Sequence, residues 1–123
     1  LELNFLCADM LRSSVFSFFR NSLSIIVSNP PYITNKELLK LSLNFEPSLA
    51  LAVPDDDPLL FYRELAKHSK EVLVDGGLLY VESSEFYADE VAALFKHEGL
   101  KNPVIKLDLQ GKKRMIRAEY SAK

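Results

Sequence analysis

Short runs of apolar residues predict several β-strands along this chain. Residues 3–6 form the first run. Leu23–Ser28 is rich in β-branched residues and is followed by two prolines, which is typical of a buried strand. Residues 78–82 have the composition of a second buried strand. Near the end, residues 104–109 and 114–120 alternate apolar and polar positions on either side of a Gly-containing turn, a pattern that predicts a β-hairpin.

Helical spacing of apolar residues predicts two amphipathic helices between these strands. Asp57 is placed to cap the first, Pro58 suits its first position, and Gly76-Gly77 is placed to end it. The second helix covers residues 85–98, and Gly99 is placed to end it. The predicted buried stripe of the first helix consists of Tyr62, Leu65, Ala66, Ser69, Val72 and Leu73.

The order of these elements predicts the fold class. Residues 9–20 are expected to form a loosely helical connector and residues 35–43 one or two helical turns. Strands that alternate with helices favour an α/β layered fold with parallel strands, here completed by an antiparallel hairpin. We therefore expect a single domain over residues 1–123.

Composition narrows the class of protein. The chain has 123 residues, a formal charge of −2 and 48% hydrophobic residues, which predicts a folded protein rather than a disordered one. No apolar stretch approaches the roughly 18 residues of a membrane span. The near-neutral charge argues against direct nucleic-acid binding through phosphate contacts. One cysteine excludes an intrachain disulfide, and without a secretory signal we expect a cytoplasmic location.

Metal ligands are scarce in this sequence. His68 and His97 stand far apart, and neither has a His or Cys at ligand spacing. We interpret both histidines as surface residues of helices and expect no metal site.

The candidate chemistry lies in Asn29-Pro30-Pro31-Tyr32, directly after the predicted strand Leu23–Ser28. In open α/β sheets, ligands bind at the carboxyl ends of the strands. The two prolines stiffen the loop and donate no backbone hydrogen bond, so the loop offers carbonyl acceptors. Asn29 adds a side-chain carbonyl and Tyr32 a flat aromatic face.

A planar –NH2 group fits these acceptors. Its two N–H bonds can point at the Asn29 side-chain oxygen and the Pro30 carbonyl, while Tyr32 stacks on the amide or base plane. A catalyst can then position the weakly nucleophilic nitrogen and stabilise the developing positive charge with carbonyl dipoles. The alternative interpretation is a turn without a function, because Asn and Pro are ordinary turn residues.

The segments around this loop carry a family resemblance. They are Ile25-Ile26-Val27-Ser28-Asn29-Pro30-Pro31-Tyr32-Ile33, Phe45-Glu46-Pro47 with Ala50-Leu51, Asp57-Pro58-Leu59-Leu60-Phe61-Tyr62-Arg63, Gly76-Gly77-Leu78-Leu79-Tyr80-Val81-Glu82 and Asp108-Leu109-Gln110-Gly111-Lys112-Lys113-Arg114-Met115-Ile116. In this order they resemble the release-factor glutamine methyltransferases, which are class I enzymes dependent on S-adenosylmethionine.

The resemblance implies a Rossmann-like, partial class I methyltransferase sheet whose first two strands are missing. Residues 1–123 would form the C-terminal part of one catalytic domain, without the glycine-rich loop that holds the cofactor's methionine end. Asp9 matches the acidic residue that binds the adenine amino group, and Met10 the position that packs on adenine. By itself such a truncated chain is expected to be inactive.

The resemblance also implies roles at the substrate. The substrate would be the Gly-Gly-Gln glutamine of peptide-chain release factors, bound by Asn29, Pro30, Pro31 and Tyr32, with Asn29, Pro30 and Tyr32 as catalytic residues. Asn29 would also face the cofactor. Glu46 follows in the next loop and is a candidate for closing the substrate pocket.

Two other functions remain open on the sequence. The same tetrapeptide suits an adenine amino group of DNA or RNA, because a flipped base presents a similar planar –NH2. Alternatively, the chain is a catalytically inactive interaction module. Without the missing strands, Leu23–Ser28 would be an open apolar edge that recruits a second copy, giving a dimer.

Overall fold

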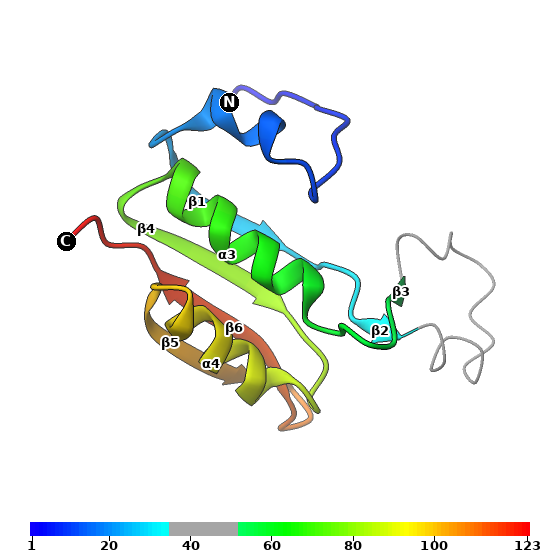
Figure 1. Cartoon of the computed structure of the whole chain (residues 1–123). Coiled ribbons are helices and arrows are strands. Elements are labelled where there is room, and N and C mark those ends of the chain that lie inside the picture. Colours follow the sequence, from blue (N-terminus) through cyan, green and yellow to red (C-terminus); the bar gives the residue numbers. More distant parts are fainter. Residues whose placement is uncertain (35–51) are drawn as a thin grey trace.

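A four-stranded sheet forms the centre of the computed structural model, which describes residues 1–34 and 52–123. The strand order is β1-β4-β6-β5 (Figure 1). β1 pairs in parallel with β4, while β6 is antiparallel to both β4 and β5. The strands are β1 (Leu23–Ser28), β4 (Leu73–Glu82), β5 (Lys101–Leu107) and β6 (Lys113–Glu119). The predicted α/β class, with its C-terminal antiparallel hairpin, is confirmed.

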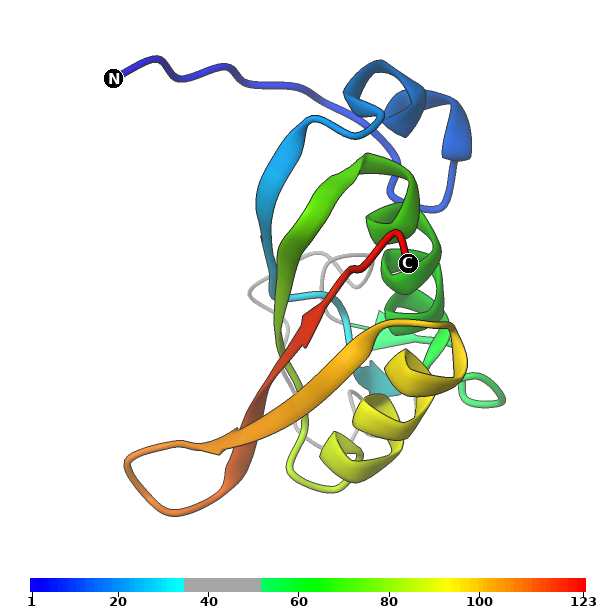
Figure 2. The same cartoon turned by 90° about the vertical axis from the view of Figure 1, so that its left-hand side faces the viewer.

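Both α-helices of the described residues cover one face of this sheet. Helix α3 (Leu60–Val72) and helix α4 (Ala88–His97) lie on the same side of it (Figure 2). The core between helices and sheet consists of Tyr62, Leu65, Ala66, Leu79, Val81, Ala88, Val91, Phe95, Leu100, Ile116 and Ala118. We call this side the covered face, and the side of the sheet away from α3 and α4 the open face.

The prediction that β1 is a buried strand is wrong. Ile25 is 55% exposed and Val27 is 78% exposed, whereas Ile26 between them packs against the core. The reason is topological, because among the described strands β1 is an edge strand with β4 as its one neighbour. Ile25 and Val27 point to the open face, where no helix within the described residues shields them.

The predicted strand at residues 3–6 does not form. Leu3, Phe5 and Leu6 are exposed, and no described residue pairs with this segment. Because a strand is stabilised by hydrogen bonds to a neighbour, an apolar run without one has no reason to form a ladder. The connector that follows contains the 3-10 helix η1 (Ser13–Phe19), as expected from its loosely helical pattern. The turns predicted at residues 35–43 lie outside the described residues.

The boundaries of α3 differ from the prediction at both ends. The side chain of Asp57 does not cap the helix, because both its carboxylate oxygens accept hydrogen bonds from Arg63, each at 2.9 Å. Pro58 precedes the first helical residue, Leu60. The helix ends before the glycines, and Gly76 and Gly77 instead lie inside β4, where the register with β1 shifts.

Gly99 ends α4 as predicted, although the helix itself is shorter than residues 85–98. Gly99 has a φ of +96°, its N–H donates to the carbonyl of Lys96, and the N–H of Leu100 donates to the carbonyl of Phe95. These are the two hydrogen bonds of a Schellman motif. The turn directs Leu100 into the core.

A short parallel ladder was not predicted from the sequence. Strand β2 (Ile33–Thr34) pairs with β3 (Ala52–Val53), so the chain after Tyr32 is held beside the segment that leads into α3. Two residues per strand are too few to produce a periodic pattern. Among the helices of the described ranges, none is long and apolar enough to cross a membrane.

Candidate functional site

The tetrapeptide lies at the carboxyl end of β1, where the sequence places it. Pro30 is buried, Pro31 and Tyr32 are half-buried, and Asn29 is exposed. The Tyr32 ring packs against the core of the covered face. The stiff diproline therefore lies between an accessible amide side chain and an anchored aromatic ring.

Asn29 borders a cavity of about 650 Å³ on the open face. Strands β1, β4, β6 and β5 all contribute side chains to it. Three of these carry charge: Glu82, Lys106 and Arg117. The lining residues are Ile25, Val27, Ser28, Asn29, Tyr80, Val81, Glu82, Lys106, Met115, Ile116 and Arg117.

Parallel pairing explains why Glu82 lies close to Asn29. Ser28 is in register with Val81, so the residues that follow each of them lie at the same end of adjacent strands. Both border the cavity. The site thus pairs an amide side chain with a carboxylate at the carboxyl ends of β1 and β4, where ligands bind in open α/β sheets.

Two tyrosines donate hydrogen bonds to Glu82. Tyr32 Oη donates to Glu82 Oε1 at 3.0 Å, and Tyr62 Oη donates to the Glu82 main-chain carbonyl at 2.7 Å. Tyr62 belongs to α3 and is fully buried. The tetrapeptide, the end of β4 and the covering helix therefore meet at one residue.

Both phenols remain protonated at neutral pH. Partial burial raises the pKa of Tyr32, and the hydrogen bond to Glu82 and its negative charge raise it further, against the opposing effect of Arg114. Burial is also the main cause of the raised pKa of Tyr62. Each hydroxyl is therefore a permanent donor to Glu82.

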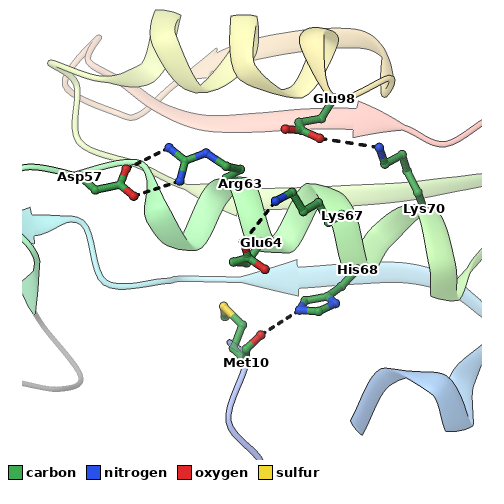
Figure 3. A network of polar contacts seen from close by, with 8 residues as sticks. All are labelled: Met10, Asp57, Arg63, Glu64, Lys67, His68, Lys70 and Glu98. Carbon is green, nitrogen blue, oxygen red and sulfur yellow. Dashed lines mark hydrogen bonds and ion pairs between the residues drawn. The ribbon is translucent and has the colours of Figure 1, made fainter. Parts of the chain in front are cut away.

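Of the three predicted cofactor residues, Asn29 borders this cavity, whereas Asp9 and Met10 do not. Met10 packs against the covered face, and its carbonyl accepts a hydrogen bond from His68 Nε2 on α3 at 2.9 Å (Figure 3). Asp9 Oδ1 accepts from the Leu11 N–H, and Asp9 pairs with Arg12 at 3.6 Å. These carboxylate contacts are local.

The structure does not bring the three predicted cofactor residues together. Asn29 lies at the cavity of the open face, whereas Met10 lies with α3 on the covered face. The cofactor roles of Asp9 and Met10 stay predictions. Glu46, the candidate for closing the substrate pocket, lies outside the described residues.

His68 is not the surface residue that we expected. It is buried, and its ring stacks on Phe16 of η1 with a centroid distance of 3.9 Å. Its role is to hold the N-terminal segment against α3. No group of three or more His, Cys, Asp or Glu residues in the described ranges could hold a metal ion.

Glu82 and Tyr62 are the site residues that sequence reasoning missed. A signal for Glu82 was present, because it ends a predicted buried strand as Asn29 follows another. If the two strands are parallel neighbours, both residues must lie at one edge. Tyr62 offered no such signal, since its position within a helical stripe predicts core packing alone.

Comparison with known proteins identifies relatives of this chain. A protein of Flavobacterium psychrophilum named release factor glutamine methyltransferase is 41% identical over 99 residues, which are 78% of this chain. A protein of the same name from Bacteroides thetaiotaomicron is 40% identical over 79% of the chain. The chain is homologous to part of the release factor glutamine methyltransferases.

The relationship covers a limited share of these relatives. The chain spans 35% and 36% of the two proteins just named. A Lactococcus lactis protein of the same name is 33% identical over 94% of the chain and 44% of its own length. No family model matches the chain. A crystal structure of a release factor-specific protein-glutamine methyltransferase from Alicyclobacillus acidocaldarius aligns over 96% of the chain and 99% of its own, with 20% identity and a TM-score of 0.46.

Proposed function

We propose that this chain forms the substrate-binding part of a cytoplasmic protein-glutamine N-methyltransferase. Its substrate would be the Gly-Gly-Gln glutamine of peptide-chain release factors, and its methyl donor S-adenosylmethionine. The observation that carries the proposal is Asn29 at the mouth of a strand-end cavity, followed by a buried diproline and the anchored Tyr32. The names of the relatives support the choice of substrate.

The chain's own residues would bind and orient the amide. One N–H of the glutamine side chain points to the Asn29 side-chain oxygen and the other to the Pro30 carbonyl, with Tyr32 stacked on the amide plane. Fixing both N–H bonds holds the amide plane, so the nitrogen lone pair, which is perpendicular to that plane, is presented on the side away from the Tyr32 ring. Carbonyl dipoles that are already in place stabilise the positive charge that develops on nitrogen. S-adenosylmethionine, when bound, would supply the methyl group. The chain would need no general base beforehand, because the amide would keep both protons until the transfer and then release one to water.

A segment exchange tests the proposal. We would replace the aligned segment of the Flavobacterium psychrophilum relative with this chain. The chimera would be incubated with S-adenosylmethionine and a purified release factor, and glutamine methylation followed by mass spectrometry. We expect methylation of the Gly-Gly-Gln glutamine, and its loss on Asn29→Ala. Methylation of adenine in an oligonucleotide, in place of the protein, would favour the nucleic-acid alternative.

The exposed edge of β1 favours a second candidate, in which the chain acts as an interaction module. A second copy pairing along β1 would place side chains of its own strand beside Val27 and Ile25 on the open face. In light scattering over a range of concentrations, we expect a dimer that Val27→Lys disrupts. Phe86→Lys is the matched control, because Phe86 is as exposed as Val27, at 78%, but lies between β4 and α4. A monomer at every concentration would contradict this candidate.

A further inference from the structure

Glu82 lies where two cavities meet. It borders the cavity of about 650 Å³ that contains Asn29, and also a second cavity of about 520 Å³ beside the hairpin turn. Met115, its register partner on β6, borders both as well. Glu82 is the acidic residue common to the two, and none of the sequence reasoning gave it a role.

The main chain of Glu82 is fixed from several sides. Its carbonyl accepts the hydrogen bond from the buried Tyr62, and the next residue, Ser83, donates its N–H to the carbonyl of Arg114 at 2.8 Å. Position 82 is therefore held both by α3 and by the β4–β6 ladder. A side chain on so rigid a base is a suitable anchor for a loop.

The Glu82 carboxylate in turn holds the far end of Tyr32. A tyrosine side chain turns about two bonds, χ1 and χ2, and rotation about the first of these sets where its hydroxyl lies. The hydrogen bond from Tyr32 Oη to Glu82 Oε1 is charge-assisted, and such bonds are shorter and stronger than neutral ones. It fixes the position of the hydroxyl, and with it the direction in which the ring projects from the loop, while packing against the core acts on the plane of the ring.

The charge of Glu82 suits this role. Arg114, on the neighbouring strand β6, also acts on the Tyr32 hydroxyl and opposes the effect of Glu82 on its pKa. Arg114 pairs with Asp108 at 3.6 Å, so part of its charge is already balanced within the hairpin. The carboxylate therefore remains the acceptor for the phenol.

We propose that Glu82 is the positioning residue of this site, which holds the Tyr32 ring where it stacks on the target amide beside Asn29. Glu82 does not touch the amide and acts through Tyr32. That the target is an amide rests on the proposed function, whereas the Tyr32–Glu82 hydrogen bond is present in the structure.

A double-mutant cycle in the chimera tests the coupling. Glu82→Ala and Tyr32→Phe should each lower kcat for methylation of a Gly-Gly-Gln peptide about tenfold, the scale of one hydrogen bond to a charged group, with less effect on KM. The double variant should lose no more than either single one. Glu82→Gln should restore most of the activity, because its amide oxygen still accepts from the phenol. Losses that multiply in the double variant would overturn the inference.

A titration separates this inference from the proposed function. In the 123-residue chain with ¹³C-labelled tyrosine, the Tyr32 signal is assigned by its absence in Tyr32→Phe. Glu82→Ala should lower the pKa of Tyr32, and Glu119→Ala, a half-buried glutamate on β6, should leave it unchanged. An unchanged Tyr32 pKa in Glu82→Ala overturns the inference whatever the chimera does. If the chimera is inactive but Glu82→Ala lowers the pKa of Tyr32, the proposed function is overturned, and Glu82 then has no target amide to position.

Discussion

Met115 and Ile116 are neighbours on β6, yet they lie in different surroundings. Ile116 points to the covered face and is completely buried beneath the helices, whereas Met115 points to the open face and is 41% exposed. The same contrast separates Ile26 from Ile25 and Val27 on β1. One face of the sheet is a packed core, and the other carries the candidate site with few contacts above it.

This contrast shows what alternation along a strand can reveal. Successive side chains point to opposite faces, so the pattern identifies which residues share a face. Whether a face is covered depends on elements elsewhere in the chain or on another molecule. A β-branched run such as Leu23–Ser28 therefore predicts a strand correctly and its burial wrongly.

Truncating the two β6 neighbours should give the largest difference. We expect Ile116→Ala to lower the free energy of unfolding by about 2–5 kcal/mol, because it removes buried methylene groups and leaves a cavity. Met115→Ala should lower it by less than about 1 kcal/mol, since its side chain already contacts water. Urea denaturation followed by circular dichroism measures both values. Equal losses would mean that a second molecule covers the open face in solution.

The covered face was the more predictable of the two. The stripe of α3 includes Tyr62, Leu65, Ala66, Ser69 and Val72, and all five are buried as expected. The boundaries were less predictable, because Asp57 had two possible partners. The sequence shows a capping position, but the choice between a backbone N–H and the Arg63 guanidinium depends on three-dimensional geometry.

Substitutions at Gly99, in the turn that ends α4, measure how much this turn contributes to the stability of the covered face. Gly99→Ala should lower the free energy of unfolding by about 1–2 kcal/mol, because an L-residue at a φ of +96° is strained. The added Cβ would meet only Lys70 Cδ, at 3.9 Å, so the loss reflects the backbone rather than a clash. Gly99→Asn should lose less, since Asn tolerates this conformation better. Thermal unfolding compares the variants, and equal losses for Ala and Asn would contradict the backbone explanation.

Only some residues of the candidate site could be selected from the sequence. Asn29 and Tyr32 stand in a short motif whose residue types suggest their chemistry, so both could be selected from the sequence. Glu82 is distant in sequence and typical of a strand end, and its bond to Tyr32 depends on the parallel pairing of β1 and β4. Pairing between distant segments is what one sequence specifies least directly.

The Asp57–Arg63 pair gives the smallest expected effect. It lies at the start of α3, where two hydrogen bonds of 2.9 Å join the carboxylate to the guanidinium (Figure 3). The hydrogen bond from Arg63 is the main cause of the lowered pKa of Asp57. Both side chains are about one-third exposed, so solvent screening limits the pair to about 0.5–1 kcal/mol.

The sign of its pH dependence follows from the lowered pKa. The folded state holds Asp57 ionised more strongly than the unfolded state, so the stabilisation is complete above the unfolded pKa of about 3.9 and disappears as pH falls through the folded pKa. Asp57→Asn should therefore be less stable than the natural chain at pH 7, with the difference shrinking below about pH 4. Asp56→Asn, at the exposed residue just before, is the matched control and should show no such trend. Urea denaturation from pH 7 to pH 3 measures the difference. If the difference in the free energy of unfolding stays constant from pH 7 to pH 3, Asp57 stabilises α3 through its shape rather than its charge.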